Sequence, residues 1–424
     1  MDNTKKIKEL FARTTSFLLT SQKKEGSWKT DIIKHKEPEV LHKDIVVTGE
    51  AVLTLDITAE LGDENAFSAI NDGIFYCNNF EIKPMDPVEW WAFKCLVMKM
   101  SNTTLANSIV QKIEQYILNN QGKEGYWPRF PLTYYITNKM AIDALRDSKY
   151  KKELQKSINW FKKSMTQDKK GWGHDTEAEP SVTAVVVSAL IVAGDDPLDN
   201  KIQIARKFLE NSQYKDGSWC STKLTIPKPT TYATALACDA LMFTSEDPFN
   251  KFVEKGISFL LKNSSNKGGW PLVPGEPVEV YPTFYVANTL AFYNYLKERW
   301  EQEDIVFLKN HLAIARVVCL LYKEFENYKK NRFRKRVIIQ ITKSKALGTT
   351  HEAAKRRIAI VKILSDEGSK DVAGMIDSLK RLSEYSRFNK KSYMTQTKLD
   401  LEYLKDIKLI NKKDNTYFIV YNFN

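Results

Sequence analysis

Acidic residues gather at three places in this sequence where they could carry out chemistry. Asp175 and Glu179 follow His174, and Asp86 and Glu89 flank the start of an apolar segment. Paired carboxylates can divide the work of acid and base, because a carboxyl group among suitable neighbours keeps its proton. The sequence therefore offers Asp175, Glu179, Asp86 and Glu89 as candidate proton donors, and solvated loop acids are the competing interpretation.

The third acidic group, 195–199 (DDPLD), has the spacing that can hold Mg²⁺ against a diphosphate. It contains a proline and falls between two predicted helices, where Asp is a common helix cap. We therefore expect capping there. A zinc site is not expected either, because Cys238 and Asp239 adjoin each other in mid-helix with no histidine placed beside them. The sequence predicts no metal ion and no other cofactor.

Aromatic residues gather where apolar segments begin, and this is where we expect a central site. Such rings could line a cavity and attract cations by about 0.5–2 kcal/mol per contact. They could equally fill the centre of the fold and leave no cavity. The sequence leaves both interpretations open. The residues are Trp90, Trp91, Tyr134, Tyr135, Tyr232, Tyr281, Phe284 and Tyr285.

The framework that must position these residues is repetitive. A phrase that begins with Gln, contains Gly and ends in Trp recurs at 22–28, 121–127, 167–172 and 213–219, and a copy without Gln ends at Trp270. The Trp residues are 99, 45, 47 and 51 residues apart. The first gap is about twice the others, so it holds one further, degenerate unit at about 67–100. Six units result.

Each unit contains an amphipathic helix before the phrase and a more apolar helix after it, such as 206–212 (RKFLENS) and 183–193 (TAVVVSALIVA). A helix that is apolar nearly all round is buried. Residues 1–300 therefore predict inner and outer rings in a mainly α fold, an (α/α)6 toroid of six helical hairpins.

The repeated phrase resembles the QW motif of squalene-hopene and oxidosqualene cyclases, and the overall plan resembles the β subunits of protein prenyltransferases. The resemblance covers about residues 6–300 and implies that Gln and Trp hold the ring together. Class II cyclases protonate their substrate with a DxDD motif, which matches 179–182 (EPSV) here. Ser181 then stands where the proton-donating Asp would be. The DCTAE pattern of oxidosqualene cyclases is similar to residues 175–179 (DTEAE), which have a different spacing.

Composition indicates a globular protein with reduced thiols. The 424 residues are 43% apolar and 27% charged, and the five cysteines show no paired spacing. The first residues carry charges throughout, and no apolar run approaches the ~20 residues of a membrane span. We expect a cytoplasmic protein without a membrane span.

Net charge divides the chain into two parts. Residues 301–424 contain 26 Lys and Arg against 15 Asp and Glu, which accounts for nearly all of the net charge of +12. A near-neutral body with a basic tail is typical of a protein whose tail meets a polyanion. We expect a connector helix with a basic linker at 301–350 and a separate domain at 351–424.

The last segment predicts three helices, at 353–364, 371–382 and 395–404, and a closing β hairpin. This order resembles a small α+β domain of the winged-helix type, whose third helix enters the major groove while the wing meets phosphates. Dimerisation or protein docking is the alternative use. The resemblance implies nucleic-acid contacts, DNA before RNA, from Arg332, Arg334, Lys335, Arg336, Thr395, Gln396, Thr397, Lys398, Lys412 and Lys413.

Two functions stand at this point. The first is a non-catalytic or catalytically degenerate cyclase-like toroid, a scaffold or sensor for an apolar small molecule or a protein, coupled to a domain that binds nucleic acid in a regulatory or genome-associated role. The second is a divergent terpenoid cyclase or prenyltransferase-like enzyme acting on an isoprenoid, with the C-terminal domain used for assembly. A closed cavity with an isolated carboxylate would favour the enzyme, and a packed or polar centre the first function. The missing acid favours the first.

Overall fold

Paired helices build most of the chain. A computed structural model describes residues 3–29, 43–84, 86–101, 104–128, 134–146, 148–221, 227–343, 351–382, 390–406, 410–413 and 415–419. Strands in this part of the chain are two to four residues long, so the predicted mainly α class is confirmed. No helix among the described residues has the length and apolarity needed to cross a bilayer.

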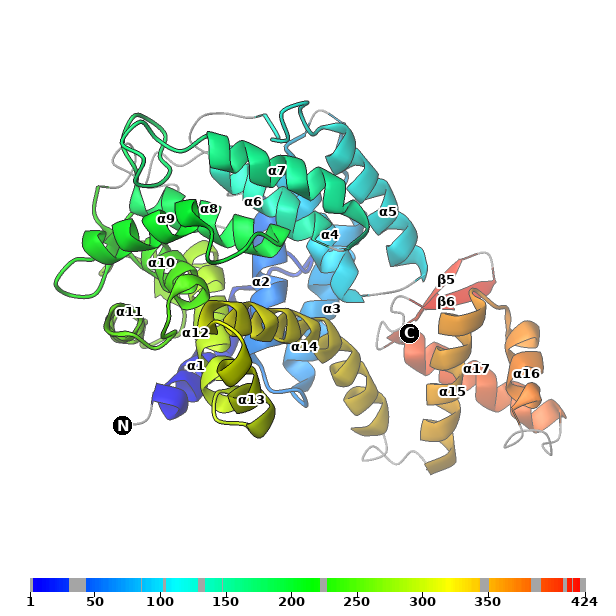
Figure 1. Cartoon of the computed structure of the whole chain (residues 1–424). Helices are drawn as coiled ribbons and strands as arrows, with labels where there is room; N and C mark the ends of the chain where they lie inside the picture. Colours follow the sequence, from blue (N-terminus) through cyan, green and yellow to red (C-terminus); the bar gives the residue numbers. More distant parts are fainter. Residues whose placement is uncertain are drawn as a thin grey trace.

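The inner helices form a closed ring (Figure 1). Each one packs on the next, and the last packs on the first. In chain order they are α2 (Asp44–Thr58), α4 (Val88–Ser101), α6 (Tyr134–Leu145), α8 (Pro180–Ala193), α10 (Thr231–Thr244) and α12 (Val280–Arg299). They are apolar nearly all round, as α8 illustrates, where every residue from 180 to 191 is buried.

The outer helices pack on the outside of this ring and alternate with the inner ones along the chain. They are α1 (Asn3–Ser21), α3 (Glu64–Asn79), α5 (Thr104–Asn119), α7 (Lys151–Lys163), α9 (Asn200–Ser212) and α11 (Lys251–Lys262). A short 3₁₀ turn, η3 (Ser148–Tyr150), precedes α7. The predicted toroid of six helical hairpins is confirmed, and so is the degenerate second unit, which is α3 with α4.

The tryptophan of each repeated phrase joins the outer helix to the inner helix of its own unit. All five indoles are fully buried. Each Nε1 donates to a carbonyl at the end of the preceding outer helix at 2.7–2.8 Å. Each backbone N–H donates to a side-chain oxygen of the following inner helix at 2.9–3.1 Å. The residues are Trp28, Trp127, Trp172, Trp219 and Trp270.

The glutamine of the phrase joins neighbouring units. The amide nitrogens of Gln22, Gln121 and Gln213 each donate to a carbonyl of their own loop and to a carbonyl of the next outer helix. In the case of Gln213 the second acceptor is the Phe252 oxygen on α11, at 2.8 Å. The glutamine side chain therefore ties the loop of one unit to the outer helix of the next.

Short two-stranded ribbons accompany the last two units. β1 (Trp219–Cys220) pairs with β2 (Pro229–Thr230), and β3 (Trp270–Pro271) pairs with β4 (Val278–Glu279), both antiparallel. Each ribbon places a tryptophan directly before the start of an inner helix.

A second helical layer covers one end of the ring. The connector helix expected from 304 to 330 is two helices, α13 (Glu303–His311) and α14 (Ile314–Lys343). α14 packs across α2, α3, α4, α10 and α12 (Figure 1). Its Tyr322 ring lies 4.8 Å from that of Phe243, and its Phe333 ring lies 6.1 Å from that of Phe67. α14 is therefore part of the toroid's packing as well as a connection.

The C-terminal segment has the predicted order of three helices and a hairpin. The elements are α15 (His351–Glu367), α16 (Val372–Arg381), α17 (Lys390–Asp406), β5 (Ile410–Lys413) and β6 (Thr416–Ile419). The hairpin is antiparallel, with Ile410 opposite Ile419, and Lys370 forms a further bridge to Tyr417. Asp400 on α17 accepts from the Nε groups of Arg356 and Arg357 on α15. The identity of this segment as a winged helix stays a prediction.

The glycines of the repeated phrase allow a test of how tightly the units abut. Gly217 has φ +92°, and a Cβ there would lie 2.4 Å from the Lys255 carbonyl oxygen on the next outer helix. Gly194 has φ +99° but faces open space. We expect Gly194→Ala to cost about 1–2 kcal/mol, the cost of a left-handed alanine. Gly217→Ala should cost at least twice as much in denaturant unfolding, and equal costs would contradict a tight contact between units.

Candidate functional site

A cavity of about 140 Å³ lies inside the ring, toward the C-terminal ends of the inner helices and beneath α14. Every inner helix contributes to its wall, and α14 contributes Tyr322, Glu326, Lys329 and Lys330. The sequence placed the site at the opposite ends of the inner helices. For the cavity in the described residues that expectation is wrong. The cavity lies where α14 folds back over the ring, and the sequence of α14 does not predict this position.

Two of the eight predicted cavity aromatics, Phe284 and Tyr285, line this cavity. Most of the others pack against neighbouring rings. The Tyr232 ring lies 4.9 Å from that of Tyr281 and 4.8 Å from that of Tyr285. Tyr135 packs on Trp160 and His174. Trp91 stacks on Tyr116, and Trp90 contacts Phe80 edge-on. The side chain of Tyr134 lies outside the described residues. Both sequence interpretations therefore hold in part: some rings fill the centre, and two face a cavity.

Asp239 on α10 is the carboxyl group that stands out in the cavity wall. Its Oδ1 is shielded from solvent and has no hydrogen-bond partner within the described structure. Removal from water raises the pKa of Asp239 to about 7, although a hydrogen bond from Thr289 and the charges of Lys139 and Lys329 oppose that rise. Near neutral pH this carboxyl group is therefore present in both protonated and ionised forms.

Ion pairs surround the α14 end of the cavity. Glu326 lies 2.5 Å from the Arg146 guanidinium and 2.6 Å from Lys329 Nζ. Burial alone would raise the pKa of Glu326, but these two cations outweigh it and lower the pKa to about 2. On α6, Lys139 pairs with Asp143 at 2.6 Å. Glu326 is thus a fixed charge, in contrast to Asp239.

A buried ion pair fastens α14 to the ring. Arg336 Nε lies 2.9 Å from Asp56 Oδ1, and neither side chain is exposed by more than 4%. Arg332 donates to the Asp56 and Ala59 carbonyl oxygens. The prediction that Arg336 contacts nucleic acid is wrong, because a buried guanidinium cannot reach a phosphate. Arg332, whose Nε and one terminal nitrogen serve the main chain, is poorly placed for that role as well.

The other predicted nucleic-acid contacts divide by exposure. Lys335, Thr395, Gln396, Lys398 and Lys412 are exposed. Thr397 is fully buried, so its predicted contact is wrong: it lies on the inward face of α17. The side chains of Arg334 and Lys413 lie outside the described residues.

The four acids proposed from the sequence are not brought together. Glu89 is buried and accepts a hydrogen bond from Thr137 on α6. Glu179 is buried and lies 2.8 Å from His174 Nδ1. Asp86 accepts from the Lys83 backbone in a turn, and Asp175 is exposed. Asp175 thus fits the solvated-loop interpretation, whereas Glu89 joins α4 to α6 and Glu179 binds His174 within its own loop. None of the four lines the described cavity.

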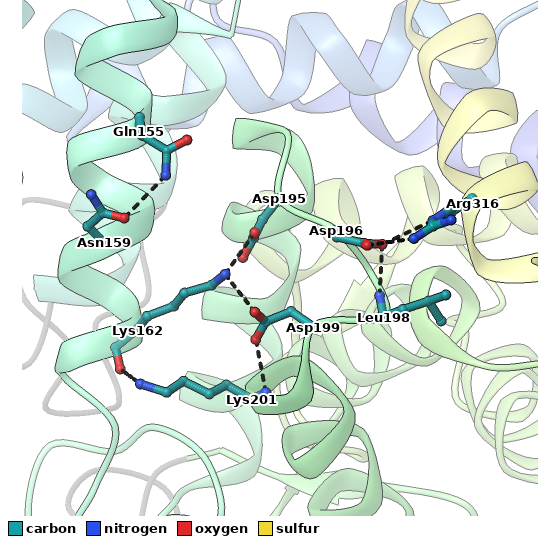
Figure 2. Close-up of polar contacts among 9 residues, drawn as sticks. All are labelled: Gln155, Asn159, Lys162, Asp195, Asp196, Leu198, Asp199, Lys201 and Arg316. Atoms are coloured by element: carbon teal, nitrogen blue, oxygen red, sulfur yellow. Dashed lines mark hydrogen bonds and ion pairs between the residues drawn. The ribbon is translucent and has the colours of Figure 1, made fainter.

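The 195–199 segment caps helices and binds cations of the chain itself, as Figure 2 shows. Lys162 lies between Asp195 and Asp199, at 2.9 and 2.8 Å, and Asp199 caps α9. Asp196 pairs with Arg316 of α14 at 2.7 Å. The expected capping role is confirmed. Within the described residues, no three His, Cys, Asp or Glu side chains converge as a metal site would require.

From the sequence, Asp239 was considered only as a zinc ligand beside Cys238, and its position in the cavity wall was not predicted. A signal was present, because Asp239 is the one charged residue in the helix TYATALACDALMFT. A lone acid in a helix that is otherwise buried needs either a cation or a cavity beside it.

Comparison with known proteins gives likeness at the level of shape. No protein-family model matches the chain, and no curated protein matches it. The type II terpene cyclase MstE from Scytonema superposes with a TM-score of 0.48 and 13% identity over 68% of this chain and 98% of that one. A protein from Actinoplanes superposes with a TM-score of 0.49 and 13% identity over 68% of this chain and 98% of that one.

An inactive variant of the α-1,6-mannanase GH76A of Salegentibacter sp. HEL1_6, in complex with α-1,6-mannotriose, has a TM-score of 0.47 and 11% identity over 67% of this chain and 98% of that one. At such scores and identities these likenesses carry no information about chemistry. The assignment of the toroid rests on the helix contacts described above.

The raised pKa of Asp239 predicts a pH-dependent cost to stability. Its pKa is higher in the folded protein than the value of about 4 expected in the unfolded chain, so ionisation favours unfolding increasingly between pH 4 and pH 7. Asp239→Asn should therefore raise the free energy of unfolding at pH 8, by up to about 4 kcal/mol, and by less than about 1 kcal/mol at pH 4. Denaturant unfolding at both pH values measures this, and an equal effect at both would contradict the raised pKa.

Proposed function

We propose that the toroid is a divergent cyclase-like enzyme in which Asp239 donates a proton to a small, largely apolar substrate. The observation that carries this proposal is a carboxyl group in the cavity wall whose Oδ1 is shielded from solvent and has no hydrogen-bond partner within the described structure. A general acid works best when its pKa lies near the working pH, and the pKa of Asp239 is about 7.

The surroundings of Asp239 suit protonation of a carbon–carbon double bond. The proton moves from the carboxyl group to one alkene carbon, the π pair forms the new C–H bond, and the other carbon becomes cationic. The rings of Phe93, Phe284 and Tyr285 line the same cavity and can stabilise that cation. Lys139 and Lys329 favour the carboxylate that remains. Loss of a proton from the cation to Asp239 completes the cycle.

The size of the cavity limits the substrate. A cavity of about 150 Å³ holds benzene, and this one is about 140 Å³. It therefore suits a group of one or two isoprene units and is smaller than the pockets of about 300–1,000 Å³ that hold drug-sized ligands. This size favours short isoprenoids among the substrates that the sequence suggested.

Proton transfer by Asp239 can be followed as solvent deuterium entering the substrate. We expect the full chain in D₂O to exchange or isomerise C5 or C10 isoprenoids, measured by mass spectrometry. Asp239→Asn should lower this rate by at least about 10²-fold, a typical loss for a general acid. The matched control is Asp175→Asn, which changes an exposed acid. Equal rates in the wild type and in Asp239→Asn would exclude Asp239 as the donor.

Nucleic-acid binding by the C-terminal segment is a second proposal, supported by a different observation. Thr395, Gln396 and Lys398 are exposed together on α17, and Lys412 is exposed on β5, in the part of the chain that carries nearly all of the net charge. A positive surface that releases counterions from phosphates would give salt-dependent affinity. A regulatory or genome-associated role rests on this proposal.

Charge reversal tests this second proposal. Lys398→Glu with Lys412→Glu should weaken binding of labelled duplex DNA at least tenfold and flatten the dependence of log K on log salt. The control is Lys207→Glu with Lys215→Glu, two exposed lysines on the toroid. Fluorescence anisotropy on the full chain measures both, with RNA as a parallel probe. Equal losses from the two pairs would contradict a specific surface.

A further inference from the structure

The charges around the cavity do not balance. Among the lining residues five are cationic and four carry carboxyl groups, one of which is Asp239. Behind the wall, Arg336 adds a further cation on Asp56, and Glu114 adds a further carboxylate on Lys99. With Asp239 protonated, positive charge exceeds negative charge at this end of the ring. The cationic lining residues are Lys99, Lys139, Arg146, Lys329 and Lys330.

Four of the five cations lie at a different depth from the apolar rings, whereas Lys139 is level with them and is paired with Asp143. The inner helices run parallel, and Lys99 follows Phe93 on α4 by six residues, about 9 Å along the axis. Arg146 follows the last turn of α6, and Lys329 and Lys330 belong to α14, which crosses this end of the ring. Phe284 and Tyr285, in contrast, lie in the first turns of α12. The cavity is therefore apolar at depth and basic beneath α14.

We propose that the ligand of this cavity carries an anionic head group, a carboxylate or a phosphate, on a short apolar body. The head lies beneath α14, near Lys329, Lys330 and Arg146, and the body lies against Phe93, Phe284 and Tyr285. This inference rests on the proposed function in that it takes the cavity to be the ligand site. It adds the charge and the orientation of the ligand.

The existing contacts show how an anion is accommodated. Lys329 Nζ lies 2.6 Å from Glu326 and 3.2 Å from Asn288 Oδ1 on α12, so this ammonium group already bridges α14 and the inner ring. An ammonium group has three donors and can serve an additional acceptor. Arg146, held by the other oxygen of Glu326, presents further N–H groups. A bound anion thus joins an existing cluster whose positive charge exceeds that of its carboxylate.

Asp239 lies between the two depths, between Leu236 and Phe243 along α10. An anion bound nearby favours its protonated form, because like charges disfavour ionisation. The neutral carboxyl group can then donate a hydrogen bond to the ligand. Binding of the anion is thereby coupled to uptake of a proton at neutral pH.

Matched probes on the full chain test the preference for an anion. The probes are 3-methylbutanoate, 3-methylbutyl phosphate and the neutral 3-methylbutan-1-ol, titrated by calorimetry at pH 7.5. We expect at least one anion to bind at least tenfold more tightly than the alcohol, and the tighter of the two identifies the head group. An alcohol that binds as tightly as both anions, or absence of binding by all three, would overturn the proposal.

Substitutions locate the head group. Lys329→Met and, separately, Lys330→Met should each reduce the affinity for the preferred anion by at least fivefold and leave that for the alcohol unchanged. The control is Lys323→Met, an exposed lysine on the same helix. Two variants are used because Lys329 also pairs with Glu326, and circular dichroism confirms that each is folded. Unchanged anion affinity in both folded variants would overturn the placement beneath α14.

Proton uptake separates this inference from the proposed function. Calorimetry in buffers of different ionisation enthalpy should show uptake of up to one proton with the anion, and Asp239→Asn should remove the uptake while keeping the preference for the anion. If Asp239→Asn retains full deuterium exchange but the anion preference holds, the proposed catalysis fails and the ligand class stands. If exchange is lost in Asp239→Asn but the alcohol binds as well as the anions, the ligand class fails alone.

Discussion

The hydrogen bonds of the buried tryptophans are the constraint on which the rest of the structure depends. Each indole spans from the end of an outer helix to the start of its inner partner, so it fixes the hairpin at the loop. Three glutamines, Gln22, Gln121 and Gln213, then tie their loops to the next outer helix. At the last unit, which lacks the glutamine, a close glycine contact closes the circle, because a Cβ on Gly268 would lie 2.1 Å from the Arg13 carbonyl oxygen on α1. A cavity can exist inside this ring because the stabilising contacts lie on its outside.

The toroid could be predicted from the sequence because its information is local and repeated. A phrase of about seven residues recurs near each hairpin, and helix periodicity supplies the remainder. The cavity could not be predicted, because it depends on α14 returning to the ring through contacts such as Asp56 with Arg336, 280 residues apart. The basic run at 329–336 illustrates the difficulty. Its charges suggest a polyanion surface, yet Arg336 is buried inside the fold, where it pairs with the Asp56 carboxylate and donates to the Asp56 and Ala59 carbonyl oxygens.

The interior combines two kinds of acid in a small space. Arg146 and Lys329 keep Glu326 ionised by lowering its pKa to about 2. The charges of Lys139 and Lys329 act more weakly on Asp239, whose pKa is about 7. The difference arises from geometry: ion-paired oxygens in one case, an unpaired Oδ1 in the other. Natural proteins commonly tolerate such an unfavourable carboxyl group where it serves a function, and its presence in a cavity wall is consistent with that pattern.

The attachment of α14 has a consequence for where this protein can be divided. The net charge changes near residue 300, and a border drawn there would look natural. A chain ending at Trp300 would nevertheless leave Asp56 and Arg146 without their partners and would uncover the Phe243 and Phe292 rings, which now meet Tyr322 and Phe325. An unpaired buried charge costs about 3–5 kcal/mol, a large share of the stability of an ordinary domain. A border at residue 300 would therefore cut through packed structure, because α14 belongs with the ring whose end it covers.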